Sequence, residues 1–265
     1  MQDPFLALSP FKNSENLLVR HSLEIAVSFF LYLFVVERRL APAINRRVFG
    51  THYTKCTDRS TRINFDIHTV SMVQCVVSLS LTAPILRQPL AASVSTFQDP
   101  FNSMVAALTC GYFLWDVCVC VKHFSQFGVG FLGHALASLY VFVIALRPFC
   151  QSWVGKFLIF EASTPFVNVN WYFSQLAAGG KVPLWLNALN GVMLILTFFC
   201  VRIVWGFSAI AILIRQLWLE RELLPVWLPL TVLLLNTALN CLNLVWLNKM
   251  IRIAKKMAKR NRKQG

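Results

Sequence analysis

A succession of apolar segments, each near the length that a helix needs to cross a bilayer, constrains this chain most. A transmembrane helix takes about 20 mostly apolar residues. Only 14% of the 265 residues are charged, against about 25% in soluble domains. Alternating strand-like segments of the barrel type are missing, so we predict an all-α membrane protein with seven transmembrane helices. The predicted spans cover residues 21–36, 67–86, 104–121, 131–146, 157–173, 184–214 and 227–246.

The distribution of Lys and Arg predicts the orientation of these spans. Residues 37–62 hold seven basic side chains, and residues 249–265 hold eight with no acid. Basic segments stay on the cytosolic side, and an odd number of spans puts both segments there. We therefore expect a lumenal N-terminus and a cytosolic C-terminus. The net charge of +14 then favours contact with anionic lipid at the cytosolic face and argues against a nucleic-acid partner. The sequence predicts nothing about oligomeric state.

Cysteine and histidine usage argues against a metal or disulfide framework. Most of the eight cysteines lie in apolar runs and none forms a CxxC pair, so we interpret them as small core side chains. The nearest set of ligand types, which would come from four separate helices, is His68, Asp116, His134 and Glu161. We expect no metal and no cofactor.

Ionisable residues at membrane depth are costly and usually face a bundle interior or a cavity. The predicted spans and their edges contain Asp66, His68, Asp116, His134, Glu161 and Arg202. All but the first two come from different segments. One ionisable side chain per helix is what a central polar chamber requires.

Helical spacing places further polar residues on the same faces. Three sets repeat at intervals of three or four residues: His134 with Ser138; Glu161 with Thr164 and Asn168; and Asn236 with Asn240 and Asn243. Pro165 has no N–H and leaves the carbonyl of Glu161 without its helical donor. Such a break is tolerated in a membrane where protein or a cavity satisfies the freed groups. We therefore predict a polar strip that faces inward.

A structural alternative stays open beside this hypothesis. Asp116 or Glu161 would pair with Arg202 and lock two helices together. The asparagines would form interhelical hydrogen bonds, each worth about 0.6 kcal/mol.

Five segments of the chain resemble the TLC-domain family, which includes translocating-chain-associating proteins, ceramide synthases and ceroid-lipofuscinosis-type proteins. The segments are GYFLWDV (111–117), GHALASLYVF (133–142), FEASTPFVNVNWYF (160–173), NGVMLILTFFCVRI (190–203) and LNLVWLNKMIR (242–252). The chain is most similar to the small TLC-domain-containing transmembrane proteins. Ceramide synthases differ, because they carry paired histidines where this chain has only His134 and a paired aspartate motif that this chain lacks.

The resemblance implies a barrel of six helices around a central tunnel, formed here by the second to seventh spans. Residues 1–62 would form the N-terminus, a leader helix and a basic loop, residues 63–252 the TLC domain, and residues 253–265 a basic cytosolic tail. It also implies the endoplasmic reticulum or a related endomembrane. The C-terminal RKQG approaches a dilysine retrieval signal.

Three functions remain open from the sequence. The first is lipid handling, in which the tunnel holds a lipid or an acyl chain and so sets membrane composition. Its predicted contacts are His68, Ser138, Glu161, Thr164, Asn168, Arg202, Asn236 and Asn240. The second is an acyltransferase that uses acyl-CoA as a substrate, with His134 as base or acyl carrier and Asp116 or Glu161 as its orienting acid. The third is a trafficking or partner-binding role of the tail.

Overall fold

The computed structural model describes residues 2–147, 149–177 and 182–262, and the side chains as far as Lys256. Within this part of the chain the protein is all helical, with no strand. Five helices are long and apolar enough to cross a membrane. They are α5 (Arg59–Ile85), α6 (Pro100–Lys122), α7 (Phe124–Ala145), the joined segment Leu184–Leu219 and α12 (Trp227–Arg262). The prediction of an all-α membrane protein is therefore confirmed.

The other two predicted spans are helical but irregular. Residues 22–49 form one rod from α2 (Ser22–Phe30), the π-helical η2 (Leu31–Leu40) and α3 (Ala41–Phe49). Residues 154–177 join α8 (Val154–Leu158), the 3-10 segment η4 (Ile159–Ser163) and α9 (Thr164–Ala177). Neither is among the five helices with the length and composition of a span, so the count of seven spans stays a prediction.

Much of the segment expected to be a basic loop is helical instead. The rod continues through Arg38 and Arg47 to Phe49, and α4 (Thr51–Thr54) follows. Pro42 lies near the start of α3, where it supplies no N–H. The wider π-helical turns of η2 precede it, and local changes of this kind let a helix pass a proline.

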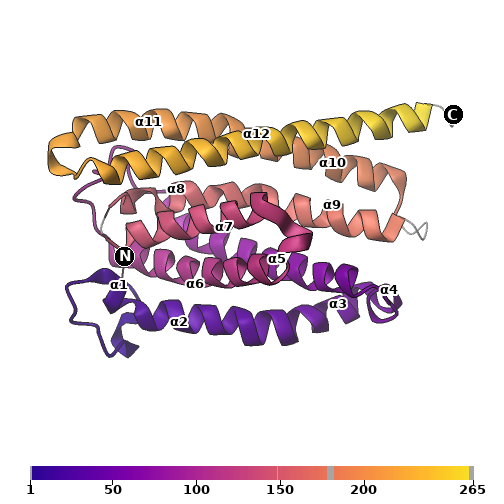
Figure 1. Ribbon diagram of the computed structural model, residues 1–265, viewed down its shortest axis with the longest axis horizontal. Coiled ribbons are helices and arrows are strands. Elements are labelled where there is room, and N and C mark those ends of the chain that lie inside the picture. Colours follow the sequence, from indigo (N-terminus) through magenta and orange to yellow (C-terminus); the bar gives the residue numbers. More distant parts are fainter. Residues whose placement is uncertain (1, 148, 178–181, 263–265) are drawn as a thin grey trace.

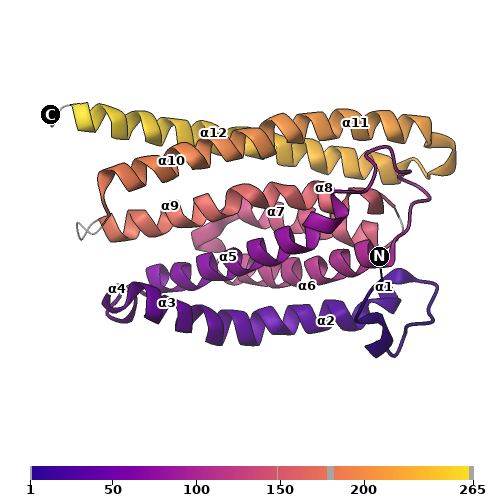
Figure 2. The same cartoon turned by 180° about the vertical axis from the view of Figure 1, so that it is seen from behind.

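The helices run roughly along one common direction (Figures 1 and 2). The rod of α2 and α3 lies along one side of the molecule. The segment α10 (Leu184–Phe198), η5 (Phe199–Val204) and α11 (Trp205–Leu219), together with α12, lies along the opposite side. One end of the bundle carries the N-terminus, α1 (Leu17–Arg20) and the turn between α11 and α12. The other carries α4 and the C-terminal end of α12, so the two basic segments lie at the same end, as the sequence predicted.

Helix α6 is the most enclosed of the five long helices. Two thirds of its apolar window (67%) is buried, whereas the other four have 17–33% buried. It packs closely on α2 and α7, and its Gly111 lies against Ser28 of α2. The weakly buried helices α10 to α12 expose large apolar side chains such as Trp185, Val192 and Leu234. Such surfaces suit a lipid environment.

Local chemistry sets where the central helices begin and bend. The Asp58 carboxylate caps α5 by accepting hydrogen bonds from the backbone N–H groups of Ser60 and Thr61. The hydrogen bond from the Thr61 hydroxyl, together with these backbone bonds, lowers the pKa of the Asp58 carboxyl group. Asp99 caps α6, which opens with Pro100, a residue suited to the first helical turn. Helix α7 is kinked at Gly128, whose φ of 72° and ψ of −173° are non-helical.

Candidate functional site

Seven polar side chains from four parts of the chain line one central cavity of about 60 Å³. This volume holds roughly two water molecules. The polar lining consists of His134 and Ser138 from α7, Glu161 from η4, Arg202 from η5, and Asn236, Asn240 and Asn243 from α12. Six residues of the inward polar strip predicted from helical spacing reach this cavity, whereas Thr164 and Asn168 of the same strip do not line it.

The position of Glu161 follows from the proline four residues later. Because Pro165 has no N–H, the carbonyl of Glu161 lacks the donor that a regular α-helix would supply. In the 3-10 segment η4, just before α9, this carbonyl accepts the backbone N–H of Thr164 instead. It also accepts a hydrogen bond from the Cys75 thiol of α5 at 3.2 Å. Thr164 donates its hydroxyl to Oε2 of Glu161 at 2.7 Å. These bonds fix the carboxylate at the cavity wall.

Arg202 lies in the π-helical segment η5 and is buried. Its Nε donates to the hydroxyl of Ser163 at 2.9 Å, and its guanidinium lies over the ring of Phe198, 5.4 Å from the ring centroid. Among the described residues it forms no ion pair with Glu161 or Asp116 within 4 Å. The alternative in which Arg202 is neutralised by direct pairing is therefore wrong, and its remaining N–H groups are available to the cavity.

The three asparagines of α12 differ in how they are bound. Asn236 donates to the carbonyl of Val232 on its own helix at 2.9 Å. Asn240 donates to the carbonyl of Gly206 on α11 at 3.4 Å. Asn243 is buried at the cavity and forms no side-chain hydrogen bond with another described residue. Only Asn240 thus forms the interhelical bond that the structural alternative required.

His134 lines the cavity without an acid to orient it. Its ring lies edge-on to the rings of Phe113 and Trp246, with centroids 6.4 and 5.7 Å away, and within the described part of the chain it has no hydrogen-bond partner. Asp116, one of the two acids predicted to orient it, is not in the cavity lining. Its contact is a weak one, from the Cys120 thiol to Oδ1 at 3.8 Å.

Three other predicted residues also lie outside the lining. Thr164 is occupied in holding Glu161. His68 and Asn168 bind each other instead, with 2.7 Å between Nδ1 and Oδ1. The His68 ring stacks on Trp171 at 4.3 Å, and Asn168 also donates to the Ser71 hydroxyl at 3.3 Å. This pair forms part of a separate contact between α5 and α9.

Sequence reasoning missed the apolar half of the site. The rest of the central cavity is lined by Phe113, Val141, Phe142, Phe157, Leu158, Phe160 and Leu239. In a chain with 22 phenylalanines nothing distinguishes these from lipid-facing ones. The spacing from polar lining residues could have identified some of them. Phe142, for example, lies one helical turn after Ser138 and so shares its face.

A larger apolar cavity of about 400 Å³ lies between α2, η2, α5 and α6, and we call it the leader pocket. Its walls include Leu23, Val27, Val77 and Leu81. A few polar groups line it. Among them the Tyr32 hydroxyl donates to Gln74, which donates to Ser78 at 2.7 Å. Sequence reasoning did not reveal this cavity, because its walls come from ordinary apolar positions.

Comparison with known proteins matches residues 64–252 to the model of the TLC domain. The chain belongs to the TLC-domain family. It is 48% identical to topoisomerase I damage affected protein 4 of Saccharomyces cerevisiae over 98% of this chain and 93% of that protein. An uncharacterized TLC domain-containing protein of Schizosaccharomyces pombe is 37% identical over 91% of this chain and 81% of its own length. Human TLC domain-containing protein 4 is 34% identical over 37% of each chain.

These relatives are TLC-domain-containing proteins and not ceramide synthases, as the sequence predicted. Within this TLC domain the five segments that carry the resemblance meet at one place. Each contributes at least one residue to the lining of the central cavity: Phe113, His134, Glu161, Arg202 and Asn243 in chain order. The central cavity is therefore the candidate functional site.

Proposed function

We propose that this TLC-domain protein handles lipid in the membrane of the endoplasmic reticulum or a related endomembrane. The central cavity would contact the polar part of the lipid. The protein would bind, present or redistribute that lipid and so act in membrane lipid homeostasis. The supporting observation is that polar groups with unused hydrogen-bonding capacity converge from separate helices on one cavity with phenyl walls.

The chemistry of the lining suits a polar group that both donates and accepts hydrogen bonds. The Arg202 guanidinium uses one hydrogen bond to Ser163, and its other N–H groups favour a phosphate or carboxylate oxygen. The Glu161 carboxylate can accept hydrogen bonds from a hydroxyl or ammonium group of the ligand. Because the two are not paired directly, each is available to a ligand that carries both kinds of group.

The size of the central cavity implies that lipid binding requires helix movement. About 60 Å³ is far below the roughly 300–1,000 Å³ of typical ligand pockets. The wall formed by α12 and the Leu184–Leu219 segment is the least buried part of the bundle, at 22% and 17%. In our proposal these helices move outward to admit the lipid.

Photocrosslinking in nanodiscs tests this proposal. Purified protein would be reconstituted with photoactivatable phospholipids and sphingolipids, and crosslinked residues mapped by mass spectrometry. We expect crosslinks at Phe142, Phe157 or Leu239. We also expect about tenfold less crosslinking in Arg202→Met and Asn243→Leu, because a lost hydrogen bond to a charged or buried partner costs about 1–3 kcal/mol.

Thr237→Val is the matched control, because Thr237 lies on α12 beside Asn236 but is exposed. Crosslinking should be unchanged in this variant. Crosslinks confined to Val77 and Leu81 would contradict the proposal and place the lipid in the leader pocket. Equal crosslinking in all variants would contradict the proposal, because the polar residues of the central cavity would then make no contribution to lipid binding.

The acyltransferase remains the second candidate because His134, Glu161 and Arg202 line one cavity. In such a reaction His134 would take the proton of an amine or hydroxyl acceptor, the acceptor would attack the acyl-CoA thioester, and CoA thiol would leave. The lack of an acid bound to His134 among the described residues favours lipid handling. Labelled acyl-CoA with a panel of sphingoid bases and lysolipids, beside His134→Ala, decides between them. Turnover that disappears in the variant would establish the enzyme.

A further inference from the structure

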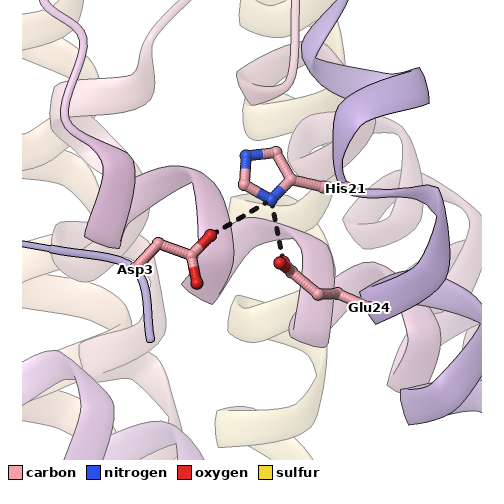
Figure 3. A group of neighbouring side chains, drawn as sticks. All are labelled: Asp3, His21 and Glu24. Carbon is pink, nitrogen blue, oxygen red and sulfur yellow. Dashed lines mark hydrogen bonds and ion pairs between the residues drawn. The ribbon is translucent and has the colours of Figure 1, made fainter. Parts of the chain in front are cut away.

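Three ionisable side chains outside the central cavity meet at the start of the leader helix (Figure 3). His21 precedes α2, Glu24 lies in its first turn, and Asp3 comes from the N-terminal segment. Nδ1 of His21 lies 2.8 Å from Oε2 of Glu24 and 3.5 Å from Oδ2 of Asp3. The side chains of His21, Asp3 and Glu24 are 2%, 0% and 5% exposed, so the group is shielded from water.

The two oxygens of Asp3 have different partners. Oδ1 accepts hydrogen bonds from the backbone N–H groups of Phe5 and Leu6, at 2.8 and 3.1 Å. These bonds hold the carboxylate so that Oδ2 is directed at His21, as Figure 3 shows. Oδ2 of Asp3 and Oε1 of Glu24 are buried and have no hydrogen-bond partner. Buried carboxylate oxygens without a partner are costly, and both point to a ligand that the protein atoms do not supply.

The charges of the trio also do not balance. The Nδ1 atom of His21 has at most one N–H, and two carboxylates face it. Even a fully protonated imidazole leaves a net charge of −1 on a buried group, and no lysine or arginine among the described residues forms an ion pair with either acid. A divalent cation with a neutral imidazole and two carboxylates gives a net charge of zero.

We propose that Asp3, His21 and Glu24 bind a divalent transition-metal ion, with Zn²⁺ as the best fit. Zn²⁺ takes His nitrogen and carboxylate oxygen at about 2.0–2.2 Å in tetrahedral geometry, which separates neighbouring donors by roughly 3.3–3.6 Å. The three donor atoms already lie within 4.8 Å of one another. The i, i+3 spacing of His21 and Glu24 matches ligand pairs that bind metals from one helix face. Imidazole disfavours Ca²⁺ and Mg²⁺.

The ion would fasten the N-terminal segment to the leader helix. Asp3 and Glu24 come from different segments, and Glu24 also borders the leader pocket. A metal at this position closes that end of the pocket beside Phe5 and Leu8, which also line it. Three protein ligands leave one position for water or another ligand, as in other open zinc sites.

Metal content and metal binding test the proposal directly. The full-length chain would be purified without a polyhistidine tag, and its metals measured by mass spectrometry. EDTA-treated protein would then be titrated with Zn²⁺, Mn²⁺ and Ca²⁺. We expect about one Zn²⁺ per chain. Asp3→Asn and Glu24→Gln should weaken Zn²⁺ binding by more than the roughly 10–100-fold lost on removal of an outer-shell partner.

Asp3→Asn is the most informative variant, because asparagine keeps the oxygen that caps Phe5 and Leu6 and changes only the atom facing His21. Glu15→Gln is the matched control, because Glu15 is an exposed acid of the same region. A second readout is tryptic cleavage after the exposed Lys12. Zn²⁺ should slow it severalfold in the wild type and in the control, but not in Asp3→Asn.

Two results would overturn the proposal. Protein that contains no stoichiometric metal and binds Zn²⁺ no better than Asp3→Asn would show that a shared proton, not a metal, holds the trio. Binding of Ca²⁺ in preference to Zn²⁺ would overturn the choice of ion.

Discussion

Gly111 lies at a close contact between α6 and α2. A Cβ atom built there would lie 2.5 Å from Cβ of Ser28 and 2.6 Å from the backbone oxygen of Ile25. The Ser28 hydroxyl donates to the carbonyl of Leu108 at 2.7 Å across the same contact. Small residues permit this close helix packing in membranes. The absence of a side chain beyond hydrogen at Gly111 therefore permits the short spacing between the leader helix α2 and α6.

We expect Gly111→Ala to lower the free energy of unfolding by about 1–3 kcal/mol, because the backbone of α2 must move to admit the methyl group. Denaturation in mixed detergent micelles would measure the change. Gly133→Ala is the control, since nothing lies within 4 Å of the added Cβ, and it should be neutral or stabilising by up to about 1 kcal/mol. Equal stability of the two variants would contradict the close contact.

At the scale of elements, three of the four segments that carry the polar lining are irregular near the site. Glu161 lies in a 3-10 segment, Arg202 in a π-helical segment, and His134 follows the kink of α7. Local departures from α-helix turn side chains away from the phase of a regular helix and often accompany functional sites. The site therefore depends on these breaks as much as on the residues.

The kink at Gly128 gives a prediction about α7. Its φ of 72° and ψ of −173° fall in a region that is essentially restricted to glycine and costs other residues about 1–3 kcal/mol. Gly128→Ala should lower the free energy of unfolding by that amount and alter the position of His134. Thermal unfolding in detergent would measure the loss. Gly130→Ala should have little effect, because its added Cβ would meet only Cδ1 of Leu242 at 3.8 Å.

The turn after α11 predicts a dependence on pH. Glu220 accepts hydrogen bonds from the hydroxyls of Ser93 and Ser95 and from the N–H groups of Val94 and Ser95. Burial raises the pKa of this carboxyl group, but these bonds outweigh that effect and hold the pKa below its ordinary value of 4.5. A lowered folded-state pKa stabilises the fold above the unfolded-state pKa, and this stability is lost as the pH falls through the folded-state pKa.

We therefore expect the melting temperature of the wild type to fall between about pH 5 and pH 3, and to fall less in Glu220→Gln. Glu222→Gln is the control, because the Glu222 side chain is 82% exposed, and it should retain the wild-type pH profile. A wild-type profile in Glu220→Gln would contradict the assigned role.

At the scale of the whole molecule, the two most basic segments of the chain lie together at one end of the bundle. The residues before α2 lie at one end, and the basic part of the rod, α4 and the tail lie at the other (Figure 1). Basic segments remain in the cytosol because their translocation is unfavourable. This arrangement supports our proposal that the N-terminus is lumenal and the C-terminus is cytosolic.

Cysteine accessibility in sealed microsomes tests this orientation. In a cysteine-free background, Lys255→Cys should react with a membrane-impermeant maleimide, whereas Asn13→Cys should react only after permeabilisation. Both positions are exposed, so no described part of the protein shields them. The opposite pattern would reverse the proposed topology, and labelling of both would indicate an even number of spans.

The sequence alone predicted the apolar parts of the helices and the inward strip of His134, Ser138, Glu161 and the α12 asparagines. These features depend on local chemistry: apolar length, the 3.6-residue period and the missing N–H of Pro165. Helical phase says which side chains share a face. It does not say how far apart two faces lie, because that separation depends on the packing of whole helices.

Only the tertiary structure decided what these faces meet. It placed His68 and Asn168 against each other, left Asp116 outside the cavity lining, and kept Glu161 and Arg202 from pairing. It also brought Asp3 to His21 and Glu24, a contact with no periodic signal because Asp3 lies outside any predicted helix. Contacts between residues distant in the chain follow from interhelical packing, which no local pattern encodes.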